Sequence, residues 1–128
     1  MTWKELGASR FALLTTYKKD GTPVGTPVWV APDGDRIVVW TNSKAWKVKR
    51  IQRNADVTLQ QSDGRGRPKG DEVLGGTATI LDAEGTQRVR DLVSRKYGLI
   101  GTLAIKLHKL FRGAEASVGL AITPRPGG

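Results

Sequence analysis

The sequence contains no cysteine and only one histidine, His108. Without thiolates the chain cannot use cysteine catalysis, ligate an iron–sulfur cluster or build a thiolate zinc site. A single histidine likewise excludes a multi-histidine metal centre, and carboxylates are too few to favour a transition-metal site. We therefore predict no metal site. The lack of cysteine is compatible with a reducing cytosol.

Long apolar runs are also missing. No run approaches the ~18 apolar residues that cross a bilayer, and the first residues have no basic stretch followed by an apolar core, as a secretory signal would. We therefore expect a soluble, cytoplasmic protein. The 128 residues contain no repeat and no linker, so residues 1–128 are expected to form a single domain.

Negative charge is scarce relative to positive charge. Twenty-one Lys and Arg face twelve Asp and Glu, which gives a formal net charge of +9. Such an excess attracts anions, and the partner can be a phosphorylated small molecule, a nucleic acid or an anionic membrane surface. Charge alone does not choose between them.

What the sequence does contain is a series of short apolar runs separated by turns. These runs predict six strands, and the absence of a parallel crossover pattern favours a mainly β protein with helices (α+β), in which an antiparallel sheet closes wholly or partly into a barrel. Pro27 has no amide hydrogen to donate, so its strand is expected at an edge or at a bulge. The strands are expected at residues 11–17, 23–31, 36–42, 57–62, 73–81 and 117–123.

Three helices are expected between these strands. One spans residues 44–53, capped by Asn42 or Ser43 and closed by Asn54, and two follow Asp82 with Gly98 as the stop between them.

The first of these helices is the strongest candidate for a binding site. Lys44, Lys47 and Arg50 share roughly one face near its start, where free backbone amides and the helix dipole already favour an anion. A phosphate placed there would meet charge, donors and dipole together. The alternative is that these side chains form an ordinary solvated basic face, as charge runs usually do.

Other residues carry weaker signals. Trp40 is expected in the core, while Trp29 and Trp46 are left open between packing and stacking on an aromatic ligand. The basic, glycine-rich segment 64–70 has the composition of a nucleic-acid contact, or of a loop that closes over a ligand. His108 has no carboxylate partner nearby in sequence, so no catalytic residue is assigned to the chain itself. If the protein is an enzyme, a cofactor must carry the reaction.

An ordered set of motifs covers nearly the whole chain and resembles the pyridoxamine 5'-phosphate oxidase-like (PPOX class) split-barrel family, in particular its actinobacterial branch associated with the deazaflavin coenzyme F-420. Each motif is weak alone, and their order is more specific. The motifs are Phe11-Ala-Leu-Leu-Thr-Thr, Asp20-Gly-Thr-Pro, Thr26-Pro-Val-Trp-Val, Thr41-Asn-Ser-Lys-Ala-Trp-Lys-Val-Lys-Arg-Ile-Gln-Arg-Asn, Gly75-Gly-Thr-Ala and Lys96-Tyr-Gly.

The resemblance implies a six-stranded antiparallel split β-barrel of the FMN-binding type, a homodimer, and a cofactor in the groove between subunits. In that family the helix start after the third strand holds the cofactor phosphate, which carries over to Lys44 and Lys47, and the ring lies along the second strand. The implied cofactor-binding residues are Thr41, Asn42, Ser43, Lys44, Lys47 and Arg50 around the helix start, and Thr26, Pro27, Val28 and Trp29 on the second strand.

The activity implied by the resemblance is hydride transfer from reduced F-420 to an unsaturated small-molecule acceptor. Two alternatives remain open: an FMN-dependent oxidoreductase of the same fold, and a non-enzymatic basic barrel that binds a cofactor or nucleic acid. The basic amphipathic segment 99–112 is longer than a minimal split barrel needs. It is expected to pack in the protein or at the dimer interface, with the substrate pocket and an anionic membrane surface as alternatives.

Overall fold

The computed structural model describes residues 2–112 and 117–125. It confirms the predicted mainly antiparallel β protein with helices. Within the described residues, no helix is long and apolar enough to cross a membrane. The elements are α1 (Trp3–Ala8), β1 (Phe11–Tyr17), β2 (Pro23–Trp29), β3 (Ala31–Asp33), β4 (Arg36–Asn42), α2 (Trp46–Arg53), β5 (Asp56–Ser62), β6 (Leu74–Ile80), α3 (Ala83–Arg112) and β7 (Ser117–Pro124).

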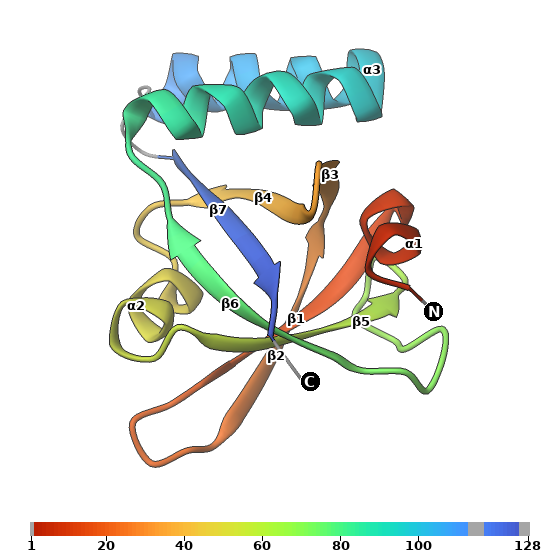
Figure 1. Ribbon diagram of the computed structural model, residues 1–128. Coiled ribbons are helices and arrows are strands. Elements are labelled where there is room, and N and C mark those ends of the chain that lie inside the picture. Colours follow the sequence, from red (N-terminus) through yellow and green to blue (C-terminus); the bar gives the residue numbers. More distant parts are fainter. Residues whose placement is uncertain (1, 113–116, 126–128) are drawn as a thin grey trace.

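The seven strands form one curled antiparallel sheet in the order β2-β1-β5-β6-β7-β4-β3 (Figure 1). The sheet has one strand more than predicted, because the segment expected as a single strand over 23–31 divides at Val30. Residues before Val30 pair with β1, and those after it pair with β4. The two edge strands are therefore joined by a single residue, which is what makes the barrel split. As predicted, Pro27 lies on an edge strand.

The main core fills the inside of the curled sheet. On β1, burial alternates strictly, so that Ala12, Leu14 and Thr16 face inward. This is the period-two pattern of a strand with one buried face. Leu6 from α1 and Ile51 from α2 pack into the same cluster, which places both short helices over openings of the barrel.

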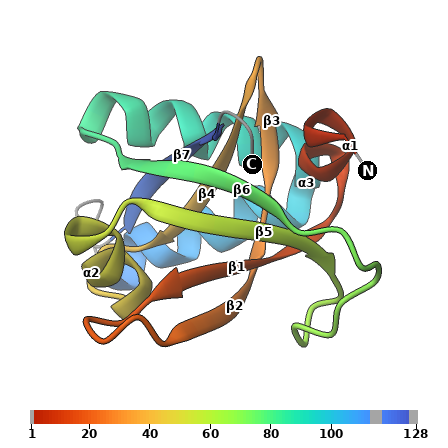
Figure 2. The same cartoon turned by 60° about the horizontal axis from the view of Figure 1, so that its bottom comes forward.

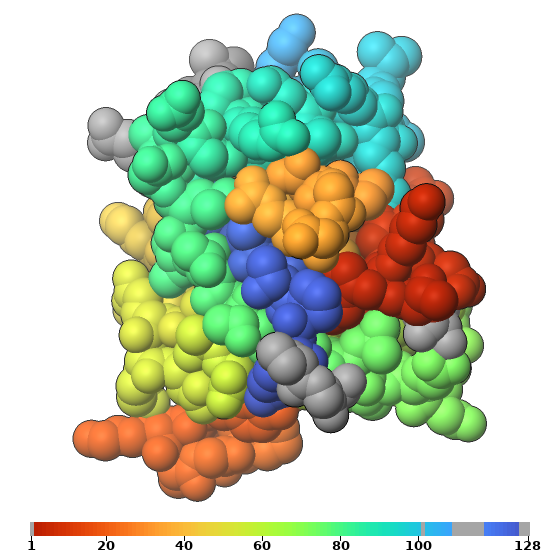
Figure 3. Space-filling view, viewed as in Figure 1, coloured from red at the N-terminus to blue at the C-terminus, as the bar shows by residue number. Residues whose placement is uncertain are grey.

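Helix α3 covers the outside of the sheet and forms a layer at one end of the molecule (Figures 1 and 3). Val89, Val93 and Ile105 pack with Val38 and Ala121, which are paired on β4 and β7. Gly98, with φ 62° and ψ −136°, breaks α3 into two parts. The predicted glycine stop between two helices is confirmed, and so is the cap at Asp82, whose Oδ1 accepts a hydrogen bond from the Gly85 amide at 2.8 Å.

Helix α1 was not predicted, although the sequence carries its signal. Thr2 and Glu5 form a capping box: the Glu5 amide donates to Thr2 Oγ1 at 3.1 Å, and the Thr2 amide donates to Glu5 Oε1 at 3.2 Å. A helix of only six residues has too few apolar positions to show a period.

Lys96 and Tyr97 tie α3 to the split corner of the barrel. Lys96 Nζ donates to the carbonyl oxygens of Gly7 at 2.8 Å, Val30 at 2.5 Å and Ser9. Tyr97 Oη lies 2.6 Å from the Val30 carbonyl oxygen and 2.7 Å from that of Arg10. Burial lowers the pKa of Lys96 to about 8 and raises the pKa of Tyr97 to about 12.

We predict that Lys96→Met lowers the free energy of unfolding by about 1–3 kcal/mol, because buried carbonyl oxygens lose their donor. We expect a larger loss at pH 9.5 than at pH 7. An unfolded lysine titrates near 10.5, so between pH 8 and 10 the unfolded chain holds a proton that the folded protein has released, and stability through this group rises with pH. Urea unfolding at both pH values measures this difference.

Lys106→Met is the matched control, because Lys106 is an exposed lysine of the same helix. It should change stability little at either pH. A loss for Lys96→Met that is equal at the two pH values would contradict the assignment. Tyr97, whose raised pKa makes stability fall as the unfolded tyrosine ionises, is present in both wild type and variant, so its contribution cancels from the difference.

Candidate functional site

The turn between β4 and α2 holds the residues that the sequence pointed to most strongly. Asn42 Oδ1 accepts a hydrogen bond from the Lys44 amide at 2.9 Å, and the Ala45 amide donates to the Asn42 carbonyl oxygen at 3.1 Å. Asn42 therefore caps the turn and not the helix, which begins at Trp46 with Ala45 as an N-cap that offers no side-chain acceptor. The predicted helix start at residue 44 is wrong, because β4 stays paired with β7 through Asn42 and the turn needs the next residues.

This shift changes how the three predicted cations lie. Lys44 is exposed in the turn before the helix, while Lys47 in the first turn and Arg50 one turn later are half-buried. Arg50 Nε donates to Thr16 Oγ1 at 2.7 Å, which ties α2 to β1. Burial, and then the charge of Arg50, lower the pKa of Lys47. Lys47 and Arg50 are thus close enough for their charges to interact, whereas Lys44 lies before the helix.

A hollow of about 430 Å³ lies between α2 and the β1–β2 hairpin, which lie side by side in Figures 1 and 2. Trp46 is its aromatic wall, with a side chain 70% exposed and Lys49 Nζ 4.5 Å from the ring centroid. None of the lining residues is acidic, so the hollow is strongly cationic. Its lining is Lys18, Lys19, Trp46, Arg50 and Arg53.

Lys18, Lys19 and Arg53 were not predicted as site residues. The hairpin turn itself was predicted, and it is held by the Thr22 amide, which donates to Asp20 Oδ1 at 3.0 Å. What the sequence did not show is that this turn meets α2. The sequence signal for these residues was a pair of lysines at a hairpin tip. Such a pair is usually solvated, so it does not by itself indicate a binding site.

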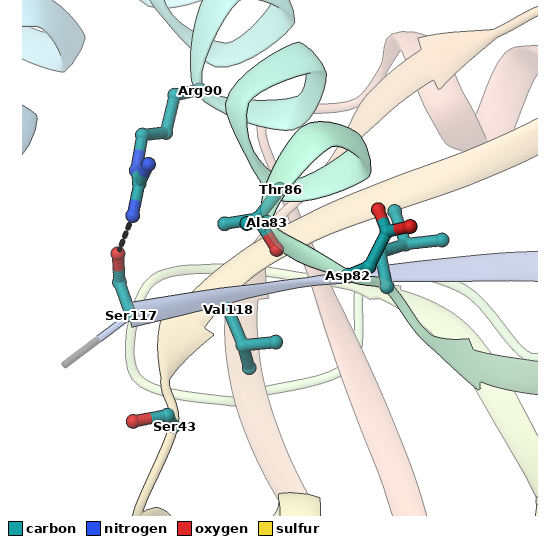
Figure 4. A pocket seen from close by; sticks show the side chains of 8 residues that line it. Ser43, Asp82, Ala83, Thr86, Arg90, Ser117 and Val118 are labelled. Carbon is teal, nitrogen blue, oxygen red and sulfur yellow. Dashed lines mark hydrogen bonds between the residues drawn. The ribbon is translucent and has the colours of Figure 1, made fainter. Parts of the chain in front are cut away.

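Ser43 lines a different cavity, of about 460 Å³, between the start of α3 and the start of β7. Figure 4 shows Arg90 reaching Ser117 across this cavity, with Nη2 donating to Ser117 Oγ at 2.8 Å. Arg90 Nη1 also donates to Gln87 Oε1 at 3.2 Å. Ser43 and Arg50 therefore line different cavities. Thr41 is buried within β4.

The four predicted residues of β2 line neither of these two cavities. Thr26 and Pro27 are half-buried, and Val28, only 8% exposed, points into the core. Trp29 stacks on Tyr97, with ring centroids 4.6 Å apart and planes 15° apart. The Trp29 side chain is therefore engaged in packing. Thr26 pairs with the inward-facing Leu14 and shares the inner face with Val28, whereas Pro27, opposite Leu13, lies on the outer face of this edge strand.

The remaining candidates lie outside the two cavities described above. Trp40 packs against the outer cluster, as expected, and His108 meets it edge-on at 5.2 Å between ring centroids. In the segment 64–70, the amides of Arg65 and Arg67 donate to Asp63 Oδ1 at 2.8 and 2.9 Å, which organises a tight turn.

Comparisons with known proteins agree with this architecture. A conserved hypothetical protein from Mycobacterium tuberculosis superposes with a TM-score of 0.71 at 24% identity, covering 98% of this chain and 81% of its own. A protein described as an F420 reductase gives 0.64 at 20% identity, covering 98% and 94%. A FAD-binding protein from Mesorhizobium loti gives 0.65 at 19% identity, covering 98% and 91%. Identities this low show the fold alone.

A search of curated proteins gave no match. The family model described as pyridoxamine 5'-phosphate oxidase matches residues 3–124, nearly the full length of the chain. The expected split barrel and the resemblance on which it rested are both confirmed. The chain belongs to the pyridoxamine 5'-phosphate oxidase family.

Proposed function

We propose that this protein is an oxidoreductase that binds an anionic flavin-type cofactor, the deazaflavin F-420, at the β4–α2 turn. The observation that carries the proposal is the pair formed by Lys47 and Arg50. Both are half-buried, and in the described part of the chain no carboxylate lies within ion-pair distance of either.

Such a pair is unfavourable in the protein alone. Burial removes hydration from the ammonium of Lys47, and the guanidinium of Arg50 repels it, which is why the pKa of Lys47 is lowered. Like charges held together without a counterion reduce stability, and the hydrogen bond to Thr16 gives a structural reason for Arg50 but not for Lys47. A phosphate group would supply the missing negative charge and favour the charged form of Lys47. The residues present therefore fit an anionic group.

In this proposal Lys47 and Lys44 bind the phosphate, and Arg50 adds a further positive charge from the next turn of α2. Thr41, Asn42 and Ser43 shape the turn that presents them, through the hydrogen bond from the Lys44 amide to Asn42. The cationic hollow lined by Trp46 extends the positive surface for the acidic remainder of the cofactor.

The ring of the cofactor is assigned to the edge strand β2, where Thr26, Pro27, Val28 and Trp29 lie. β2 pairs only with β1, so one side of its backbone is available. The Val28 side chain is in the core and the Trp29 side chain stacks on Tyr97, so these two residues contribute only their backbone groups. When bound, a reduced deazaflavin supplies hydride for the reduction of an unsaturated small-molecule acceptor. The residues of the chain bind and orient the cofactor, and no side chain is assigned to proton transfer.

Two structural relatives support this choice of cofactor class, since one is described as an F420 reductase and another as a FAD-binding protein. The proposal includes a homodimer in the cytoplasm, in which the second copy completes the groove. FMN is the alternative cofactor, because it carries the same phosphate.

We predict that Lys47→Ala weakens F-420 binding about tenfold or more, because a charge-assisted hydrogen bond to the phosphate is lost. Fluorescence titration of the purified protein measures the affinity. Lys44→Ala should weaken binding in the same direction. No binding by the wild-type protein at micromolar concentration would overturn the proposal.

Lys69→Ala is the matched control, because it removes the same charge from the exposed loop beyond β5. It should leave F-420 affinity unchanged. If the protein instead binds nucleic acid, Lys69→Ala should weaken that binding as much as Lys47→Ala does, and affinity should fall steeply with salt.

The choice between deazaflavin and flavin has its own test. Parallel titrations with F-420 and FMN should give tighter binding of F-420, because its acidic tail can form ion pairs with the cations around Trp46. We expect Lys18→Ser/Lys19→Ser to weaken F-420 more than FMN. If FMN binds more tightly than F-420, and if its affinity is the same for wild type and for the double lysine variant, the FMN-dependent alternative is favoured.

A further inference from the structure

We propose that the second half of α3 docks this protein onto an anionic lipid surface. Beyond Gly98, four large apolar side chains of the helix are exposed: Leu99 is 89% exposed, Ile100 60%, Leu103 58% and Leu107 44%. These four residues are called the α3 stripe. In the described part of the chain, the other exposed large apolar side chains are Trp46 and Val73, which lie elsewhere.

The helix does not need the α3 stripe for its own packing. Ile105 is buried against Val89 and Val93, and His108 lies against Trp40. At about 100° per residue, Ile105 and His108 project from the side of the helix opposite the α3 stripe. The helix is thus already anchored to the sheet by one face, while its outward face is also apolar. A solvated outer face would be polar.

The charge around the α3 stripe identifies its occupant. The segment 99–112 contains no Asp or Glu and three cations, of which Lys106 is exposed, and Arg95 is exposed just before the break at Gly98. An apolar stripe flanked by cations on an interfacial helix is the combination that binds anionic bilayers, with the apolar side chains entering the boundary between headgroups and acyl chains. The net charge of +9 adds a long-range attraction to such a surface.

A second copy of the chain is a less favourable binding partner for the α3 stripe. A two-fold interface would place the same surface patch on both sides, so Arg95 and Lys106 of each copy would approach the other copy's acid-free segment. Like charges that face one another oppose association. The α3 layer also forms one end of the molecule, opposite the β1–β2 hairpin, as Figures 1 and 3 show.

Flotation of the full-length protein with vesicles tests the apolar part of this proposal. Wild type should float with vesicles of phosphatidylcholine and phosphatidylglycerol (3:1), and much less with phosphatidylcholine alone. Leu99→Ser/Leu103→Ser should reduce the bound fraction at least about fivefold. Val73→Ser, at an exposed apolar position outside α3, should not. Failure of wild type to float, or unchanged flotation of the double variant, would overturn the proposal.

A pair of charge reversals tests the electrostatic part. Lys106→Glu and Lys69→Glu change the net charge equally, but only Lys106 lies beside the α3 stripe. Lys106→Glu should weaken vesicle affinity at least about fivefold more than Lys69→Glu. Equal effects would mean that general charge binds the vesicles, and would overturn the role of α3.

Sedimentation velocity separates the lipid from a protein partner. The double variant should keep the oligomeric state of wild type. A wild-type dimer that Leu99→Ser/Leu103→Ser dissociates would show that a second copy covers the α3 stripe, and would overturn the proposal. Circular dichroism melting confirms that the variants fold. None of these measurements requires a cofactor, so they can fail or succeed independently of the proposed enzyme activity.

Discussion

The carbonyl group of Val30 is the point on which the arrangement of this molecule depends. Its oxygen is approached by both Lys96 Nζ and Tyr97 Oη, while its side chain is fully buried in the barrel core. The same residue separates β2 from β3. These two edge strands meet at a corner there and do not pair with each other, so the barrel stays open. The motif Lys96-Tyr97-Gly98 therefore secures the split and then turns the chain into the second half of α3.

Charge is distributed over this frame unevenly. Where cations serve the fold they have partners: Asp33 lies 2.8 Å from Arg88 and 2.9 Å from Arg36, which secures α3 to the β3–β4 turn and holds the pKa of Asp33 below its usual value. Around α2 the described cations have no such partners. Asp33 thus neutralises cations that secure the fold, whereas Lys47 and Arg50 have no carboxylate partner among the described residues.

Local chemistry predicted most of the fold. Alternating apolar residues located the strands, Asp82 and Gly98 bounded the helices, and Pro27 marked an edge. The bend at Val30 was not predictable, because it depends on hydrogen bonds from Lys96 and Tyr97, more than sixty residues away. The candidate site was predicted in part: Lys47 and Arg50 came from spacing on one helix, whereas Lys18 and Lys19 meet Arg50 only through the packing of α2 against β1.

An open sheet with two edge strands is exposed to aggregation, because an unpaired edge can form hydrogen bonds with a strand from another molecule. Here three of the six prolines lie on the edge strands, Pro23 and Pro27 on β2 and Pro32 on β3. Each lacks the amide hydrogen that an incoming strand would bond. The missing donors weaken pairing with an incoming strand, while the carbonyl oxygens of the same edges can still accept hydrogen bonds.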